Sequence, residues 1–288
     1  FKLIRFIYDV FNMKRSLEIL VLSDIHLGTY GCQSKALLKY LKSVDPKIIV
    51  LNGDIIDIWQ FNKRYFPKSH MKIVKYFLNL IQEGKTIYYL TGNHDEMLRR
   101  FNGFELKNFK ILNKKVINLN GHKAWFFHGD VFDVSMKYSK WIAKLGGFGY
   151  DLLIVINSIL NFLLIKMGYQ KYSLSKKIKN GVKGAIKFIN KFEETIVEIA
   201  SERGYKYVVC GHIHQPNIKT IISKGNEVIY LNSGDWIENL TALEYNNGEW
   251  TLYHHEQNDS GGVEKEIAEK NYKEIYAELM DEFQINET

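Results

Sequence analysis

Short apolar runs rich in β-branched residues alternate with amphipathic helical patterns through the first 130 residues of the chain. The apolar runs predict strands at residues 17–22, 47–52 and 86–90. The segments between them carry apolar residues at helical spacing and predict helices at residues 34–44 and 70–82. Because strands that are separated by helices usually pair in parallel, the pattern indicates an α/β protein with a parallel sheet.

Beyond Leu106 the helical spacing stops, and short strand patterns follow one another with turn residues between them. FKILN, KVINLN and KAWFFH come first, and YKYVVC, IKTIIS, EVIYLNS, LTALEYN and EWTLYHH come after residue 204. The stretches SKGN and NNG predict hairpin turns. Two sheets that face each other, each covered by helices, would accommodate this order.

The segment between these two halves, residues 134–203, has a helical pattern and no clear strand signal. Its centre, LLIVINSILNFLLI at residues 152–165, is apolar except for Asn157, Ser158 and Asn161. The stretch 152–165 is shorter than the roughly 20 residues needed to cross a bilayer. We therefore interpret them as an apolar helix in an inserted helical cap, although a core helix buried on all sides fits the pattern nearly as well.

The predicted domain organisation has three parts. The core comprises residues 17–133 and 204–255, and the lysine-rich apolar cap at 134–203 is inserted into it. Residues 256–288 form an acidic C-terminal linker and helix, in which SGGV precedes an apolar stripe at helical spacing. Stripes of that kind usually pack on the parent domain, and we assign this helix no function.

Composition and charge narrow the class of protein. With 46% hydrophobic residues and three prolines among 288, the chain can build a core and does not fit a disordered protein. Its net charge of +7 is uneven, because eleven lysines oppose one aspartate in residues 134–191 while ten acids oppose three lysines in 256–288. The asymmetry indicates an anionic partner for the middle segment, with two solvated helical faces of opposite sign as the alternative.

The cysteines and the N-terminal stretch bear on the compartment. Cys32 and Cys210 lie in no paired motif that would indicate a disulfide framework or a zinc ribbon, so we expect a reducing compartment. The first residues, FKLIRFIYDVF, are apolar and basic but have no small-residue cleavage site, and we do not interpret them as a signal peptide. Both observations favour the cytoplasm.

Five of the predicted strands end in side chains that can bind a metal ion. These side chains are Asp24 and His26, Asp54 and Asp57, Asn93, His94 and Asp95, His128 and Asp130, and His212 and His214. A single strand-end Asp or His is most often a turn or cap residue. Because the carboxyl ends of strands in an α/β sheet border a common crevice, five such ends together predict that these side chains converge in space.

Carboxylates and imidazoles that converge without a cation are costly, because like charges repel and burial removes water. Carboxylate, imidazole and amide ligands without a thiolate suit divalent Mn²⁺ first, with Fe or Zn²⁺ as alternatives. The predicted ligands exceed what one small ion accepts. We therefore expect two divalent ions that share a bridging carboxylate, an arrangement typical of phosphatases and nucleases.

The motifs DxH, GDxxD, GNHD, HGD and GHxH, in that order, resemble those of the calcineurin-like metallophosphoesterases over residues 17–255. The resemblance implies a four-layer α/β/β/α sandwich of two mixed sheets. It implies that one metal is held by Asp24, His26, Asp54 and His214. It also implies that a second metal is held by Asp54, Asn93, His128 and His212, with Asp54 as the bridge.

His94 is left outside that ligand set. Two metal ions lower the pKa of the water they bind, which supplies a nucleophile for in-line attack on phosphorus near neutral pH. An imidazole beside such a site can donate a proton or a charged hydrogen bond to the leaving oxygen, provided that a carboxylate fixes its tautomer. The Asp–His pair of the family implies Asp57 as that partner, and Asp95 is the alternative. Simple packing of His94 beside the site remains the other interpretation.

The cap bears on the substrate. A lysine-rich insertion around an apolar helix, next to a two-metal crevice, suits a substrate with phosphates at one end and acyl chains at the other. A nucleic acid would be better served by base-stacking aromatics. Within the family, GDIIDIW, HGD and LNSGDWIENLTALEY resemble the UDP-2,3-diacylglucosamine diphosphatases of lipid A synthesis. This resemblance implies hydrolysis of UDP-2,3-diacylglucosamine to UMP and 2,3-diacylglucosamine 1-phosphate by an enzyme that is peripheral on the inner face of the inner membrane.

The resemblance also implies substrate contacts from the basic stretch 172–179, through Ser173, Ser175, Lys176 and Lys179. The sequence departs from that group at one position: the best-known branch reads GNRD, with arginine where His94 stands here. Arg99 or Arg100 could supply that positive charge.

The alternative enzyme is a phosphodiesterase or phosphatase acting on a soluble nucleotide or phosphoprotein. A binding scaffold without catalysis is a further alternative, which the complete ligand set disfavours.

Overall fold

The first sheet of the computed structural model is mixed and has the strand order β12-β11-β1-β2-β3-β5-β4. The structure describes residues 14–59, 66–132 and 191–255. The strands of this sheet are β1 (Arg15–Leu22), β2 (Val44–Asn52), β3 (Thr86–Leu90), β4 (Glu105–Leu106), β5 (Phe109–Leu112), β11 (Thr241–Asn246) and β12 (Glu249–His254). Strands β1, β2, β3 and β5 run parallel, with Val21 paired to Val50 and Val50 paired to Tyr88. The parallel sheet expected from the alternating pattern is confirmed.

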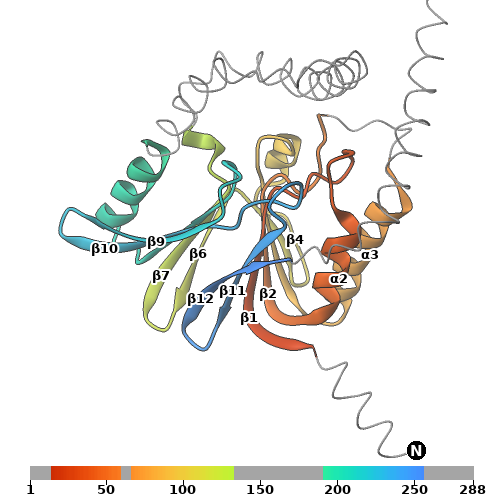
Figure 1. Ribbon diagram of the computed structural model, residues 1–288, viewed down its shortest axis with the longest axis horizontal. Helices are drawn as coiled ribbons and strands as arrows, with labels where there is room; N and C mark the ends of the chain where they lie inside the picture. The colour runs from red at the N-terminus through yellow and green to blue at the C-terminus, as the bar shows by residue number, and fades with distance from the viewer. Residues whose placement is uncertain (1–13, 60–65, 133–190, 256–288) are drawn as a thin grey trace, which may run out of the picture. The chain divides into compact units, whose positions relative to one another are not determined.

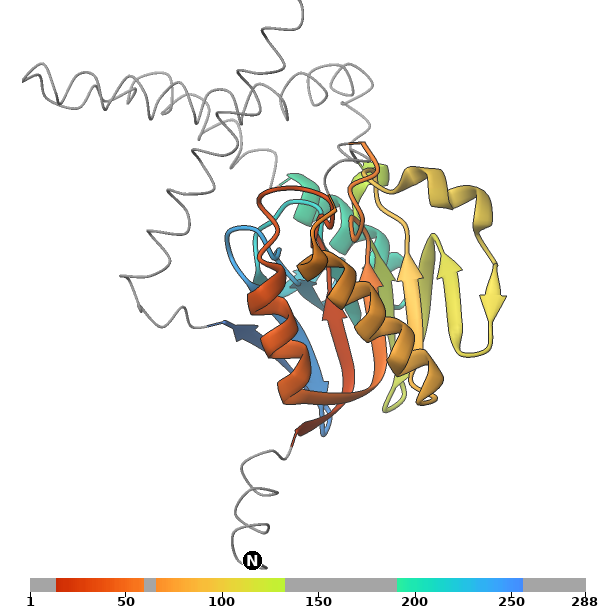
Figure 2. The ribbon, with the colours of Figure 1, turned by 90° about the vertical axis from the view of Figure 1, so that its right-hand side faces the viewer.

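Two amphipathic helices, α2 (Ser34–Ser43) and α3 (Lys68–Gln82), connect these parallel strands. Each buries one stripe at helical spacing, with Leu37 and Leu41 in α2 and Ile73 and Phe77 in α3. Figure 2 shows both helices on the same face of the first sheet, in front of its parallel strands. The helices and strands predicted for this half are confirmed, with ends that differ by a few residues.

The second sheet has the strand order β6-β7-β8-β10-β9. Its strands are β6 (Lys114–Leu119), β7 (His122–Phe127), β8 (Tyr207–Cys210), β9 (Asn217–Ser223) and β10 (Asn226–Asn232). Strands β7, β8 and β10 are parallel, and β6 and β9 close the edges as antiparallel hairpin partners. The hairpin turns predicted at SKGN and NNG are confirmed, since Lys224 and Asn247 have the positive φ that such short turns need before a glycine.

Four layers follow from the way the strands divide their side chains. Because successive strand residues point to opposite faces, Leu20 of β1 packs toward the helices while Val21 packs toward the second sheet. The cluster between the sheets joins Val21 and Val50 to Phe126 and Val209. Figure 1 shows α2 and α3 outside the first sheet, the two sheets face to face, and a helix outside the second. The predicted α/β/β/α sandwich of two mixed sheets is confirmed.

The fourth layer is the helix formed by residues 191–202. Its apolar stripe, which includes Phe192, Ile196 and Val197, is buried against strand residues Trp125 and Val208 of the second sheet. These residues were expected to belong to the inserted cap, and the structure instead places them in the core, because their stripe fits the outer face of that sheet. The rest of the expected cap, residues 134–190, and the tail at 256–288 lie outside the described residues.

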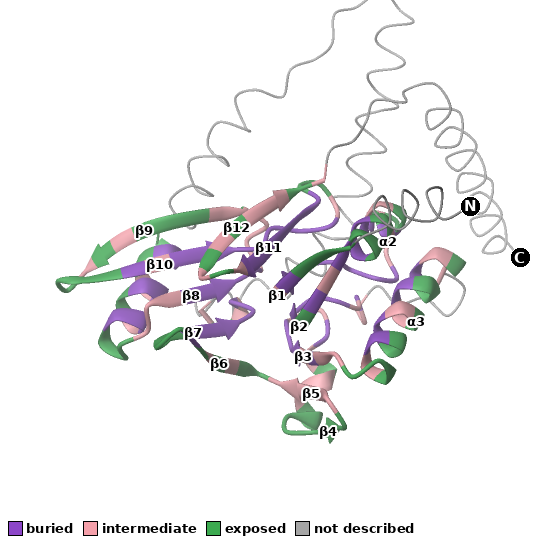
Figure 3. Cartoon of the chain, turned by 90° about the horizontal axis from the view of Figure 1, so that it is seen from below, coloured by how far each residue is buried: buried purple, intermediate pink, exposed green. Residues whose placement is uncertain are grey.

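The distribution of burial agrees with this layering (Figure 3). The central strands of both sheets are largely buried, whereas the edge strands β4, β6, β9 and β12 carry most of the exposed strand residues. Cys32 and Cys210 are both buried and free. None of the helices in the described ranges is long and apolar enough to span a membrane.

Candidate metal site

The polar side chains that follow five strands gather at one place. Three groups of possible metal ligands have their ligand atoms within 4.8 Å of one another, namely Asp24 with His26 and His214, His26 with Asp54 and His94, and Asp54 with His128 and His212. Because neighbouring groups share His26 or Asp54, they form one continuous cluster. The first and second sheets both contribute to it, so the predicted convergence of the strand ends is what the structure shows.

Backbone conformation brings these side chains together. Positive φ angles occur at five of the predicted ligands, which are Asp24, His26, Asp54, His212 and His214. This conformation is uncommon for residues other than glycine and clusters at functional sites, because the surrounding structure must hold it in place. Each such residue turns the chain sharply after its strand, so that side chains from separate strands point at one another.

The motif glycines leave room for the ligands. A Cβ atom at Gly92 would lie 2.2 Å from Oδ1 of Asp54, and a Cβ atom at Gly211 would lie 2.6 Å from Oδ2 of Asp24. Both distances are far shorter than carbon and oxygen atoms tolerate. The glycines of GNHD and GHIH are therefore required by the close approach of neighbouring loops.

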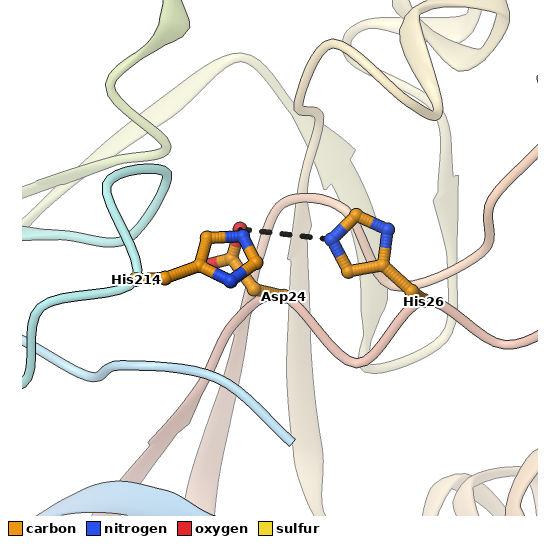
Figure 4. Close-up of side chains that lie close together, drawn as sticks. All are labelled: Asp24, His26 and His214. Carbon is orange, nitrogen blue, oxygen red and sulfur yellow. Dashed lines mark ion pairs between the residues drawn. The ribbon is translucent and has the colours of Figure 1, made fainter. Parts of the chain in front are cut away.

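One half of the cluster contains Asp24, His26 and His214 (Figure 4). Nε2 of His214 lies 3.2 Å from Oδ1 of Asp24, and Nε2 of His26 lies 4.0 Å from the same oxygen. The other Asp24 oxygen accepts a hydrogen bond from the backbone N–H of His212 at 3.0 Å. One carboxylate oxygen is thus held by the protein and the other faces two imidazole nitrogens.

The other half contains Asp54, His128, His212 and Asn93. Nε2 of His128 lies 3.2 Å from Oδ2 of Asp54, and Nδ1 of His128 lies 2.8 Å from the backbone carbonyl of Asn52. A carbonyl can only accept a hydrogen bond, so His128 carries a proton on Nδ1 and turns Nε2 toward Asp54. The remaining Asp54 oxygen accepts the backbone N–H of His94 at 2.8 Å.

The cluster meets the chemical requirements of a metal site. Within the described residues, four buried side-chain atoms of the predicted metal ligands have no hydrogen-bond partner, and they are Asp24 Oδ1, His26 Nε2, Asn93 Oδ1 and His128 Nε2. Buried polar atoms are nearly always satisfied, so unsatisfied atoms grouped in one place require an explanation. All four belong to predicted ligands and are of the types that divalent transition metals accept.

His94 lies against the cluster and is paired with Asp57. Its Nδ1 is 2.8 Å from Oδ2 of Asp57, and its Nε2 is 4.0 Å from Oδ2 of Asp54. The ring also packs against Trp59, with centroids 4.5 Å apart. Of the two carboxylates considered from the sequence, Asp57 is therefore the one that contacts this imidazole.

Asp95 has a different set of contacts. It accepts the hydroxyl of Tyr89 at 2.6 Å and the backbone N–H groups of Gly92 and Ile55 at 2.6 and 3.1 Å. The last two donors lie in the loops that follow β3 and β2. Asp95 therefore ties the GNHD loop to the GDIID loop and does not pair with His94.

Comparison with known proteins decides the family. The sequence model of the calcineurin-like phosphoesterases matches residues 17–216. The chain belongs to that family. It is accordingly a metal-dependent phosphoester hydrolase, and the His and Asp cluster is its divalent-metal site.

This calcineurin-like phosphoesterase is similar to curated bacterial proteins. A protein of Aliivibrio fischeri named UDP-2,3-diacylglucosamine hydrolase is 25% identical to it, over 82% of this chain and 98% of that protein. A protein of the same name from Wigglesworthia glossinidia brevipalpis is 23% identical, over 80% of this chain and 91% of its own length. Among solved structures, an archaeal phosphodiesterase is 13% identical with a TM-score of 0.40, and the match covers 82% of this chain and 98% of that one.

The electrostatics of the phosphoesterase site favour bound cations. Burial alone would raise the pKa of the Asp24 carboxyl, but the imidazoles of His214 and His128 lower it. Although burial lowers the pKa of a histidine, the Asp54 and Asp24 carboxylates raise the pKa of His128 to about 10. The carboxylates are thus ionised at neutral pH and must be balanced by positive charge, for which protons and metal ions compete.

Several residues around the phosphoesterase site had no role in the sequence-based prediction. Asp235 contacts His214, and the Ser23 hydroxyl bonds to that of Ser233 at 2.6 Å, behind the Asp24 loop. The stretch LNSGDW carries a family resemblance, but its position in the sequence does not show which strand ends it meets. Arg99 forms an ion pair with Asp130, so its charge is already balanced. The predicted substrate residues Ser173, Ser175, Lys176 and Lys179 lie outside the described residues.

Proposed function

We propose that this enzyme is a two-metal hydrolase that cleaves the pyrophosphate of UDP-2,3-diacylglucosamine at a membrane surface. The products are UMP and 2,3-diacylglucosamine 1-phosphate. The observation that carries the proposal is the alignment of about four-fifths of the chain with proteins named UDP-2,3-diacylglucosamine hydrolase. The described site supports it, because the cluster offers ligands for metal ions and an imidazole beside them.

The proposed ligands divide the cluster into two sites that share Asp54. The first site comprises Asp24, His26, Asp54 and His214, and the second comprises Asp54, Asn93, His128 and His212. Asp54 suits the bridging role because it belongs to two of the groups of possible metal ligands. One of them contains His26, and the other contains His128 and His212. Mn²⁺ is our first choice of metal, with Fe and Zn²⁺ as alternatives. Bound ions of this kind lower the pKa of water and polarise the phosphoryl oxygens.

His94 is the proposed proton donor to the leaving phosphate oxygen. Its Nδ1 faces Asp57, so a proton is held there and Nε2 is directed toward the cluster. Burial lowers the pKa of His94, but the hydrogen bond to Asp57 and the charge of Asp54 raise it above the ordinary value. Asp57 therefore keeps the imidazole protonated and oriented at neutral pH, as a general acid requires.

The residues proposed to bind the lipid part of the substrate lie outside the described ranges. We propose that the lysine-rich apolar cap binds the acyl chains, and that Ser173, Ser175, Lys176 and Lys179 contact the nucleotide or its phosphates. A peripheral position on the inner face of the inner membrane belongs to the same proposal, because a diacylated substrate resides in a bilayer.

The experiment is to incubate the purified enzyme and Mn²⁺ with UDP-2,3-diacylglucosamine and to measure UMP. Release of UMP that stops on addition of a chelator supports the proposal. Hydrolysis of a small chromogenic phosphodiester without any release of UMP contradicts this substrate. That second result would favour the alternative, a phosphodiesterase or phosphatase acting on a soluble nucleotide or phosphoprotein. Histidine rather than arginine at position 94 is the observation in favour of that alternative.

A further inference from the structure

Asp235 lies directly behind a proposed metal ligand. It follows β10 in the stretch LNSGDW, and it is fully buried. Its Oδ2 lies 3.5 Å from Nδ1 of His214, on the side of the imidazole opposite to Nε2, which faces Asp24. The carboxylate, the imidazole and the Asp24 oxygen therefore form a continuous row across the end of β8.

The Asp235 carboxylate is held rigidly in that place. Its Oδ1 accepts the backbone N–H groups of Ile237, Glu238 and Asn239 at 2.8, 2.6 and 3.2 Å. The Asn239 side-chain amide donates to Oδ2 of Asp235 and to the backbone carbonyl of His214. One oxygen is thus fixed by the backbone, and the other is held by Asn239 and faces the imidazole.

Two other histidines of the cluster are arranged in the same way. Nδ1 of His128 faces the carbonyl of Asn52 at 2.8 Å, and Nδ1 of His26 faces Asp57 at 3.2 Å. In each case an acceptor behind the ring stabilises the proton on Nδ1 and leaves Nε2 free to bind a metal. For His214, Asp235 is the group that occupies this position.

We propose that Asp235 is a positioning residue that sets the tautomer and orientation of His214 for metal binding. The inference rests on the ligand set of the proposed function. It adds that the two metal sites depend on different outer groups, because Asp235 faces the Asp24 half alone. The loss of Asp235 therefore weakens the site of Asp24, His26 and His214 and spares the site of His128 and His212.

The variant Asp235→Asn tests the inference sharply. An asparagine has nearly the same shape, and its side-chain oxygen can still accept the backbone N–H groups of Ile237, Glu238 and Asn239. Its amide nitrogen then faces Nδ1 of His214 as a donor, which favours the proton on Nε2 and blocks the metal-binding atom. The matched control is Glu244→Gln, which also neutralises a buried carboxylate but one that pairs with Arg15 and Tyr40.

The first measurement is a calorimetric titration of Mn²⁺ into the metal-free wild type and both variants. We expect two sites in the wild type and in Glu244→Gln. In Asp235→Asn we expect one unchanged site and one weakened by about 10–100-fold, the usual effect of removing an outer partner of a ligand histidine. Two sites of wild-type affinity in Asp235→Asn would overturn the inference.

The second measurement is the ¹⁵N NMR signature of the His214 imidazole in the Zn²⁺-loaded protein. The wild type should show a protonated Nδ1 and a metal-bound Nε2, and Asp235→Asn should show a protonated Nε2 at a Zn²⁺ concentration that fills its unchanged site but not its weakened one. The protonation pattern of the His214 ring does not respond to a general loss of stability. If Nδ1 of His214 lacks a proton in the wild type, that spectrum alone overturns the inference. A wild type that binds fewer than two ions would contradict the two-metal proposal, while the His214 tautomer would still decide the role of Asp235.

Discussion

Oδ2 of Asp57 lies 2.8 Å from Nδ1 of His94 and holds that imidazole with its Nε2 toward the metal site. The same oxygen lies 3.2 Å from Nδ1 of His26, which belongs to the group with Asp24 and His214. A single buried carboxylate thus orients both the proposed proton donor and a proposed metal ligand. The two roles can be separated by substitution.

His94→Gln should lower kcat by about 10²–10⁴-fold, the usual contribution of a general acid, and leave Mn²⁺ affinity unchanged. Asp57→Asn should lower kcat to a similar extent and also weaken Mn²⁺ binding, because His26 loses its outer partner. Steady-state kinetics and Mn²⁺ titration of both variants provide the test. Full activity in His94→Gln would mean that His94 merely packs beside the site.

Gly92→Ala should abolish tight metal binding at the half of the site that contains Asp54 and His128. The added Cβ would lie 2.2 Å from Oδ1 of Asp54, so that this carboxylate must move. Gly84→Ala is the matched control, because its Cβ would meet nothing within 4 Å although φ is +87° there. The control should lose some stability through backbone strain and bind Mn²⁺ normally. Equal Mn²⁺ affinity in the two variants would contradict the packing described for the GNHD loop.

These relationships show what could be predicted from the sequence. The strands that end in Asp24, Asp54 and His128 were recognisable because each is a short apolar run that stops at a polar ligand. Asp235 was not recognisable as a neighbour of His214, because only the pairing of β10 beside β8 brings it there.

The helix at residues 191–202 shows a different limit. Residues 185–202 carry one continuous helical pattern without a glycine or proline, so the sequence does not separate this helix from the predicted cap. An apolar stripe indicates that a helix packs against something, and it does not indicate which surface it packs against. The outer face of the second sheet is that surface for Phe192 and Ile196.

Tyr89→Phe should lower the free energy of unfolding by roughly 1.5–3 kcal/mol, the usual contribution of a hydrogen bond to a charged group. The Tyr89 hydroxyl donates to the buried carboxylate of Asp95 at 2.6 Å. Tyr76→Phe is the matched control, since the Tyr76 hydroxyl donates to the neutral carbonyl of Leu41, and it should cost about 0.5–1.5 kcal/mol. Urea unfolding of the three proteins measures both values. A smaller loss in Tyr89→Phe than in Tyr76→Phe would contradict a stabilising hydrogen bond from Tyr89 to an ionised Asp95.

Stability should fall as the pH is lowered through the range in which His70 becomes protonated. Burial lowers the pKa of His70, and its Nδ1 accepts the backbone N–H of Gly28 at 3.0 Å, which requires the neutral ring. A histidine with a lowered pKa in the folded state stabilises the protein above its unfolded pKa of about 6.5, and this contribution is lost as the pH falls below that value. The difference in unfolding free energy between wild type and His70→Gln should therefore shrink as the pH falls below about 6.5. A constant difference would contradict this assignment.

Anomalous diffraction from crystals grown with Mn²⁺ would show whether separate strand ends hold two cations that share Asp54. We expect two anomalous peaks at about 3.5–4 Å from each other, one on the side of Asp24 and His214 and one on the side of His128 and His212. A single peak, or none at saturating Mn²⁺, would rule out a two-metal site that shares Asp54.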